Sequence, residues 1–182
     1  GEYLNAQLIA KVFTHLGVPA RFVDPKEIGL RVDDNARSAT FDTKSYNTIA
    51  ELDLSTSERL IVPGFFGYTE NGDIATFSRG GSDITGAIMA RGLSADLYEN
   101  FTDVSAIYAV NPSIIENPAA IKQMTYDEMR ELSYAGFAVF HDEAIIPAIQ
   151  GGIRINIKNT NDPEAPWLTI CRLISCSFRG VT

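Results

Sequence analysis

The sequence has 182 residues, of which 45% are hydrophobic and 21% charged, as is ordinary for a soluble globular domain. Its 23 acidic and 15 basic residues leave a formal net charge of -8, which excludes the broad basic surface that nucleic-acid binding requires. No apolar run is long enough to span a bilayer and no secretory signal is present, so we expect a cytoplasmic protein without membrane or nucleic-acid partners.

The first part of the chain predicts a helix followed by short strands. Apolar residues recur at helical spacing over residues 4–16, and Gly17 follows where a glycine commonly ends a helix. Residues 18–24 and 59–62 are typical of strands, whereas the polar stretch 29–57 predicts an excursion with short pieces of structure. The chain starts with glycine and enters a helix at once, so we expect a segment before it.

A hairpin and a second helix come next. Residues 64–79 surround Asn71-Gly72, a dipeptide that suits the positive φ angles of a hairpin turn. Beyond the hairpin, apolar residues at helical spacing predict a helix over residues 84–93.

The second half of the chain alternates strands with helices. Strands are predicted over residues 96–101, 106–110, 138–140 and 153–157, and helices over residues 125–136 and 142–150. Thr125-Tyr-Asp-Glu128 has the sequence of a capping box, in which each side chain accepts a hydrogen bond from the other residue's backbone N–H. This alternation predicts an α/β fold with a mainly parallel sheet covered by helices.

Arg79-Gly-Gly-Ser-Asp83 is the first candidate for a ligand-binding loop. Gly80 and Gly81 let the backbone approach a ligand, and the helix that follows presents unsatisfied N–H groups and the positive end of its dipole. Arg79 can bind a carboxylate and Asp83 an ammonium group, which is the pairing that an α-amino acid needs. The alternative is a glycine turn in which Ser82 or Asp83 only caps the helix.

Thr102 and Asp103 are the second candidate, because they directly follow a predicted strand. Ligands of open α/β sheets bind beyond the carboxyl ends of the strands, where Asp103 can accept from a ribose or adenine group. The alternative is an ordinary Asx or Ser/Thr turn. Glu2 lies at the start of the first helix, where a carboxylate favours the dipole, and by itself it indicates nothing more.

These motifs become specific in combination. The stretch VPGFFGYTENGDIATFSRGGSDITGAIMARGLSADLYENFTDVSAIYAVNP, preceded by GEYLNAQL and followed by MTYDEMRELSYAGFAVFHDEAIIPA and INIKNTNDPEAP, closely resembles the aspartate kinases of the amino acid kinase family. The resemblance implies a three-layer αβα fold and phosphoryl transfer from ATP, with Mg²⁺, to the β-carboxylate of L-aspartate. The product, 4-phospho-L-aspartate, opens the pathway to lysine, threonine and methionine, and the full-length form is expected to be a homo-oligomer.

The resemblance also implies roles for individual residues. Glu2 matches a glutamate that helps to hold aspartate, and Arg79 matches an arginine that binds a substrate carboxylate. The loop around the amino acid is matched by Gly80, Gly81, Ser82 and Asp83, and we expect the catalytic roles at Arg79 and Asp83. The nucleotide contacts are matched by Thr102, Asp103 and Tyr108.

Several family features are absent from the chain. The Lys-Phe-Gly-Gly-Ser-Ser loop that usually opens the domain has no counterpart, Ser113 replaces a common arginine, and Ala138 replaces a lysine. Trp167 stands where glycine is usual, and residues 167–182 do not resemble the family. We therefore expect an N-terminally incomplete catalytic domain over residues 1–166, a divergent tail after it, and no regulatory ACT domains.

Two alternatives stay open for the function. Without the lysine loop, the chain alone is expected to be inactive and could bind nucleotide or amino acid without turnover. A different acceptor within the same superfamily, namely glutamate, acetylglutamate or UMP, is the other alternative, although the segments around residues 79–83 and 125–145 favour aspartate.

Overall fold

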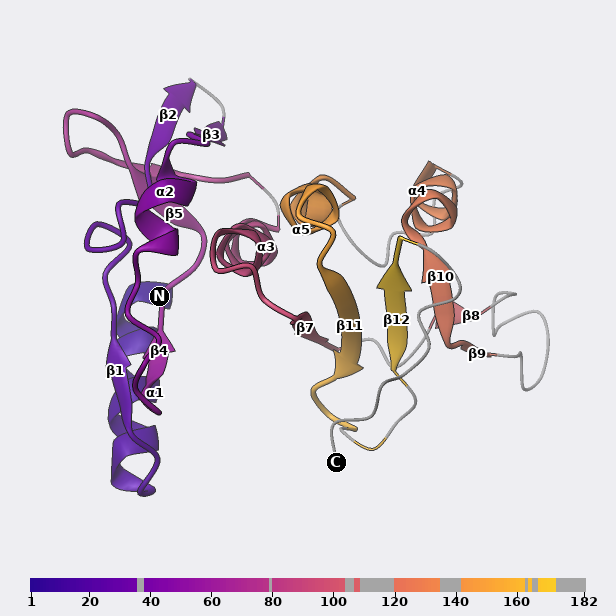
Figure 1. The fold of residues 1–182 in the computed structure, drawn as a ribbon, viewed down its shortest axis with the longest axis horizontal. Coiled ribbons are helices and arrows are strands. Elements are labelled where there is room, and N and C mark those ends of the chain that lie inside the picture. The colour runs from indigo at the N-terminus through magenta and orange to yellow at the C-terminus, as the bar shows by residue number, and fades with distance from the viewer. Residues whose placement is uncertain are drawn as a thin grey trace. The chain divides into compact units, whose positions relative to one another are not determined.

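The computed structural model describes residues 1–35, 38–78, 80–103, 107–108, 120–134, 142–162, 164 and 167–172. They fall into two compact units, Gly1–Ser94 and Ala95–Thr182 (Figure 1). Within this part of the chain, no helix has both the length and the apolar character needed to cross a membrane.

The described part of the first unit combines helices with three pairs of short strands. In chain order its elements are α1 (Glu2–His15), β1 (Ala20–Phe22), β2 (Val32–Asn35), β3 (Ser38–Phe41), α2 (Ser45–Ala50), β4 (Arg59–Ile61), β5 (Phe66–Tyr68), β6 (Ile74–Thr76) and α3 (Gly81–Gly92). β1 and β4 pair in parallel, whereas β2–β3 and β5–β6 are antiparallel hairpins. Helix α1 lies along β1 and β4 (Figure 1).

Helix α1 ends at the predicted glycine. Gly17 has a φ of +80°, and the N–H of Val18 donates to the carbonyl of Phe13 at 2.9 Å, which is the hydrogen bond of a Schellman motif. The buried residues of α1 are Ala6 and Ala10, whose small side chains let the helix backbone approach its neighbours closely. The larger exposed apolar residues of this helix are Tyr3, Leu4, Leu8 and Val12, and Leu16, directly after it, is exposed as well.

The predicted hairpin turn is confirmed between β5 and β6. Gly72 has a φ of +87°, and the N–H of Thr69 donates to the carbonyl of Asp73 at 2.8 Å. The core of this unit lies beneath the two hairpins and between α2 and α3. It consists of Val23, Ile28, Leu30, Val32, Ala39, Ile49, Ala75, Phe77 and Ile88.

The second unit is built around a mixed sheet. Its described elements are β7 (Leu97–Thr102), β8 (Ile107–Tyr108), β9 (Ala120–Ile121), β10 (Gln123–Thr125), α4 (Tyr126–Tyr134), η1 (Asp142–Ile145), α5 (Ile146–Gln150), β11 (Arg154–Asn159) and β12 (Leu168–Cys171). The strand order is β10-β12-β11-β7, in which β10–β12 and β11–β7 are parallel and β11–β12 is antiparallel. Helices and parallel strand pairs in both units confirm the predicted α/β fold.

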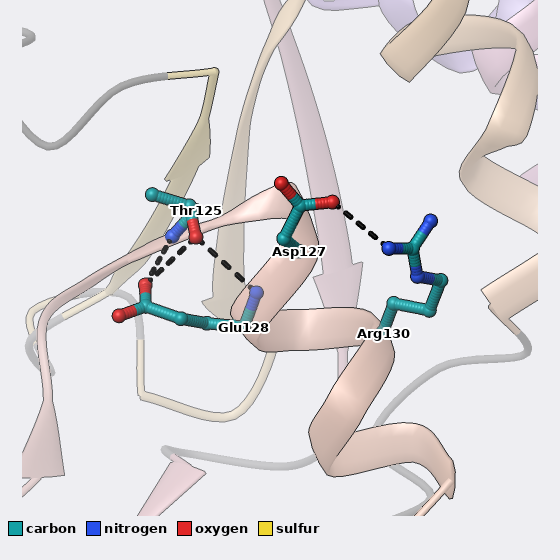
Figure 2. Close-up of polar contacts among 4 residues, drawn as sticks. All are labelled: Thr125, Asp127, Glu128 and Arg130. Atoms are coloured by element: carbon teal, nitrogen blue, oxygen red, sulfur yellow. Dashed lines mark hydrogen bonds and ion pairs between the residues drawn. The ribbon is translucent and has the colours of Figure 1, made fainter.

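Figure 2 shows that the predicted capping box forms at the start of α4. The Glu128 carboxylate accepts from the backbone N–H of Thr125 at 2.7 Å and from its hydroxyl at 2.9 Å, while the Glu128 N–H donates to the Thr125 hydroxyl at 3.2 Å. Because the carboxylate accepts from the Thr125 N–H, the pKa of Glu128 is lowered. An ion pair between Asp127 and Arg130, 3.0 Å long, spans the first turn of the same helix.

Two predicted features of the second unit take a different form. The helix expected over residues 142–150 is a 3₁₀ turn, η1, followed by α5, because Pro147 suits the first turn of a new helix and cannot donate within a continuous one. Strand β12 lies within residues 167–182, where no strand was predicted. In the sheet it pairs with β10 on one side and with β11 on the other. The strand expected at 138–140 lies outside the described residues.

Candidate functional site

Helix α3 begins earlier than the sequence predicts, and the residue before it is a glycine. Gly80 adopts the left-handed conformation, with φ +73°, and makes no side-chain cap, so the helix starts at Gly81. Ser82 and Asp83 therefore belong to the first helical turn, and the prediction that one of them caps the helix is wrong. The position of Ser82, as the second residue of the helix, leaves its hydroxyl for a contact outside the helix.

Ser82 contacts Glu2, which is also predicted to bind aspartate. Its hydroxyl donates to Oε1 of Glu2 at 2.6 Å, although the two residues are 80 positions apart in the sequence. Glu2 comes from the first turn of α1 and Ser82 from the first turn of α3. The fold thus brings two helix starts together, each with the positive end of its dipole.

Tyr3 anchors the start of α1 and so fixes the position of Glu2. Its ring packs edge-on against Phe22, with centroids 5.1 Å apart, and lies tilted against Phe66, with centroids 6.3 Å apart. The Tyr3 hydroxyl donates to the Asp24 carboxylate at 3.0 Å, and this hydrogen bond raises the pKa of the tyrosine. Two aromatic contacts and a polar contact therefore hold the helix end beside the strands.

The loop between β4 and β5 packs tightly against the start of α3. Phe65 has a φ of +84°, which is strained for a residue with a side chain, and its N–H donates to Oγ1 of Thr85 at 3.1 Å. Thr85 is buried and donates in turn to the carbonyl of Gly81 at 2.9 Å. A Cβ atom on Gly64 would lie 2.9 Å from Cα of Ser82, so only glycine fits there.

Phe65 and Thr85 are residues that sequence reasoning missed. The positive φ of Phe65 depends on tertiary packing, and the only sequence signal was the preceding Pro63-Gly64 turn. Strained backbone concentrates at functional sites, so this loop belongs to the candidate site together with Glu2 and Ser82. Arg79 lies outside the described residues, as do Ser113 and Ala138.

Thr102 and Asp103 lie at the carboxyl end of β7, in the second unit. The Thr102 hydroxyl is 3.4 Å from Oδ1 of Asp103, and the carbonyl of Thr102 accepts from the N–H of Thr160 at 2.8 Å. Asp103 is exposed, so its carboxylate is accessible at the strand end. Tyr108 pairs through its backbone with Ala120 in the β8–β9 ribbon.

Asn159, at the carboxyl end of β11, is a buried polar residue beside this strand end. It pairs with Thr102 across the parallel strands, and its Oδ1 accepts from the N–H of Asn161 at 2.7 Å. Asn159 was not predicted as a site residue, yet its position just after the predicted strand 153–157 is the same signal that identified Thr102. The two strand ends form one polar edge.

The two sites differ in the chemistry that they can support. On the first unit, the Glu2 carboxylate and the N–H groups at the start of α3 can hold the ammonium and carboxylate groups of an amino acid. On the second unit, the hydroxyl and carboxylate of Thr102 and Asp103 are acceptors that suit a ribose or a base. No group of three or more His, Cys, Asp and Glu side chains that could hold a metal ion occurs among the described residues.

Known proteins resemble this chain in sequence and in structure. A model of the amino acid kinase family matches residues 1–159. Aspartokinase 3 of Bacillus subtilis (strain 168) is 56% identical over 168 residues, which is 91% of this chain and 36% of the Bacillus protein.

Two solved structures agree with this result. The crystal structure of Clostridium acetobutylicum aspartate kinase is 44% identical, with a TM-score of 0.78 over 100% of this chain and 38% of that one. The E. coli aspartokinase III structure in complex with lysine and aspartate is 26% identical, with a TM-score of 0.87 over 97% of this chain and 40% of that one. The chain spans 36–40% of the length of these three relatives. With the family model matching residues 1–159 of its 182, the chain belongs to the amino acid kinase family.

Proposed function

We propose that the protein carrying this chain is an aspartate kinase, which transfers the γ-phosphoryl group of ATP to the β-carboxylate of L-aspartate. The product is 4-phospho-L-aspartate, an intermediate on the way to lysine, threonine and methionine. The observation that carries the proposal is the 2.6 Å hydrogen bond between Glu2 and Ser82, which joins two helix starts into an amino-acid site in a chain 56% identical to an aspartokinase.

The aspartate site of this proposal is built from the first unit. Glu2 and Asp83 supply carboxylates for the substrate ammonium group, and Arg79 supplies a guanidinium for a substrate carboxylate. Gly80, with its φ of +73°, and Gly81 allow the substrate to approach the backbone N–H groups at the start of α3. Phosphoryl transfer needs positioning and charge neutralisation rather than covalent help, so we assign the catalytic roles to Arg79 and Asp83.

The nucleotide site of this proposal is built from the second unit. Thr102 and Asp103 hold the ribose or base, with Tyr108 nearby in the sequence. Mg²⁺ enters as part of the substrate, bound to the phosphate oxygens of ATP, because Mg²⁺ usually keeps few protein ligands. The metal neutralises phosphate charge, while the protein side chains orient the nucleotide.

The organisation of the whole protein is part of the same proposal. Residues 1–166 belong to the catalytic domain, residues 167–182 are divergent from the family, and the full-length protein is a cytoplasmic homo-oligomer. Size-exclusion chromatography with light scattering would measure the oligomeric state directly.

A substrate panel tests the activity. The complete protein that carries the chain is incubated with Mg-ATP and aspartate, glutamate, acetylglutamate or UMP. Acyl phosphates formed on the carboxylate acceptors are trapped as hydroxamates, and UDP formed from UMP is measured by chromatography. We expect hydroxamate from aspartate, whereas product from another acceptor only would refute the assignment. Binding of aspartate and ATP without any product would support a binding protein without turnover.

The variant Glu2→Gln tests the site itself. It removes a charged hydrogen-bond partner, so we expect the KM for aspartate to rise about tenfold or more while the KM for ATP stays within about twofold. Glu70→Gln is the matched control, because Glu70 is an exposed residue at the β5–β6 turn. An unchanged KM for aspartate in Glu2→Gln would remove Glu2 from the site.

A further inference from the structure

Lys158 lies at the centre of a small cluster in the second unit. Its Nζ is 2.5 Å from Oε1 of Glu99, 5.7 Å from the ring centroid of Phe101 and 5.2 Å from that of Trp167. We name these four residues the Lys158 cluster. The Lys158 side chain is 24% exposed, so solvent screens its ion pair and its two cation–π contacts only in part.

The Lys158 cluster lies on the face of β7 opposite to the side chain of Thr102. Side chains alternate along a strand, so Glu99 and Phe101 point to one face and Thr102 to the other. Phe101 pairs with Lys158 across the parallel strands, which places both on the cluster's face. The side chains of the cluster therefore do not contact a ligand bound at the Thr102 side chain. They can affect its binding only through the backbone.

The backbone that joins β11 to β12 links the cluster to the strand end. The connection begins at Thr160, whose N–H donates to the carbonyl of Thr102 at 2.8 Å. It ends at Trp167, directly before β12, with the indole over Lys158. Both ends of this connection are thus attached to the last residues of β7 and β11, which hold Thr102 in place.

We propose that Trp167 and Lys158 are positioning residues, which hold the turn of Thr102 and Asp103 in the geometry that binds the nucleotide. This inference rests on the proposed function, because it takes Thr102 and Asp103 as the nucleotide contacts. It also gives a role to Trp167, whose position the family resemblance would fill with glycine. The indole of Trp167 anchors the end of the connection between β11 and β12, whereas a glycine has no side chain that could make this contact.

Nucleotide affinity and the two KM values test the inference in the complete protein. Trp167→Leu removes the aromatic face, and Lys158→Met removes the charge but keeps the aliphatic stem. For each, we expect affinity for Mg-ADP, measured by calorimetry, to fall about five- to tenfold, with a matching rise in the KM for ATP. The KM for aspartate should stay within about twofold. Trp167→Phe should restore nucleotide binding, and Tyr134→Leu, which changes an exposed aromatic residue of α4, should have no effect.

The outcomes separate this inference from the proposed function. Wild-type affinity for Mg-ADP in both Trp167→Leu and Lys158→Met would overturn the positioning role, as would equal rises in both KM values, which indicate general loosening. If the wild type binds Mg-ADP but phosphorylates no aspartate, the proposed function fails while the affinity series still decides the role of the cluster. A wild type that binds no Mg-ADP overturns both.

Discussion

Replacing Gly64 with alanine should displace the start of α3 and weaken aspartate binding. The new Cβ would lie 2.9 Å from Cα of Ser82 and 3.2 Å from its Cβ. To reach an ordinary carbon–carbon distance of about 3.5 Å, the Ser82 backbone has to retreat by about 0.6 Å. Inserting one methyl group into a tight contact of this kind costs about 1–3 kcal/mol of unfolding free energy.

The same displacement should also lower the activity toward aspartate. Ser82 carries the hydrogen bond to Glu2, and a misplacement of about 1 Å at a catalytic site can cost about 100-fold in rate. We therefore expect Gly64→Ala to lower kcat/KM for aspartate about tenfold. The measurements are urea unfolding of each variant and aspartate saturation curves at saturating Mg-ATP.

Gly92→Ala is the matched control at the other end of the same helix. Its Cβ would lie 2.5 Å from Cγ2 of Ile49, so this variant should lose a similar amount of stability, about 1–3 kcal/mol, far from the predicted aspartate site. Its kcat/KM for aspartate should remain near that of the wild type. If Gly64→Ala and Gly92→Ala show the same kcat/KM, the close approach of Gly64 to Ser82 does not position the substrate.

Two further variants probe the hydrogen bonds of single residues. Thr85→Val removes the acceptor of the part-buried hydrogen bond from the N–H of Phe65, which should cost about 1–3 kcal/mol in urea unfolding. Thr85→Ser should retain most of the stability, and equal stabilities of the two variants would contradict this. Glu128→Gln tests the capping box, in which the folded state lowers the pKa of Glu128 below its ordinary value of 4.5. Its ionised carboxylate therefore contributes stability above pH 4.5, and this stability is lost as the pH falls through the lowered pKa. The wild type should thus have a larger unfolding free energy than Glu128→Gln at neutral pH, and this margin should shrink below pH 4.5. A margin that does not change on acidification would contradict this.

Local signals in the sequence predicted the parts of the fold that depend on neighbouring residues. The capping box at Thr125 and Glu128 and the turn at Gly72 need only a few residues, and both form as expected. The start of α3 was placed too late, because the left-handed conformation of Gly80 is set by packing of Gly81 against the Phe65 loop.

The candidate site depended on long-range contacts that spacing alone does not reveal. Glu2 by itself suggested only a favourable dipole, and the family resemblance paired it with the loop of Ser82. The strain at Phe65 was not predicted, because the Pro63-Gly64 turn indicates only a turn and a positive φ in a residue with a side chain is imposed by its surroundings. Strand β12 was missed because the resemblance ended at Pro166, although its residues, LTIC, are suited to a strand.

The place of β12 has a consequence for the order in which the protein acquires its structure during synthesis. β12 is made last among the described strands, yet it lies between β10 and β11 and supplies hydrogen bonds to both. Until residues 168–171 emerge from the ribosome, β10 and β11 each have an unpaired edge that another nascent chain could join. The hydrogen bonds of this described sheet are therefore completed only after its last strand has been synthesised, and until then its open strand edges are sites that a chaperone can protect.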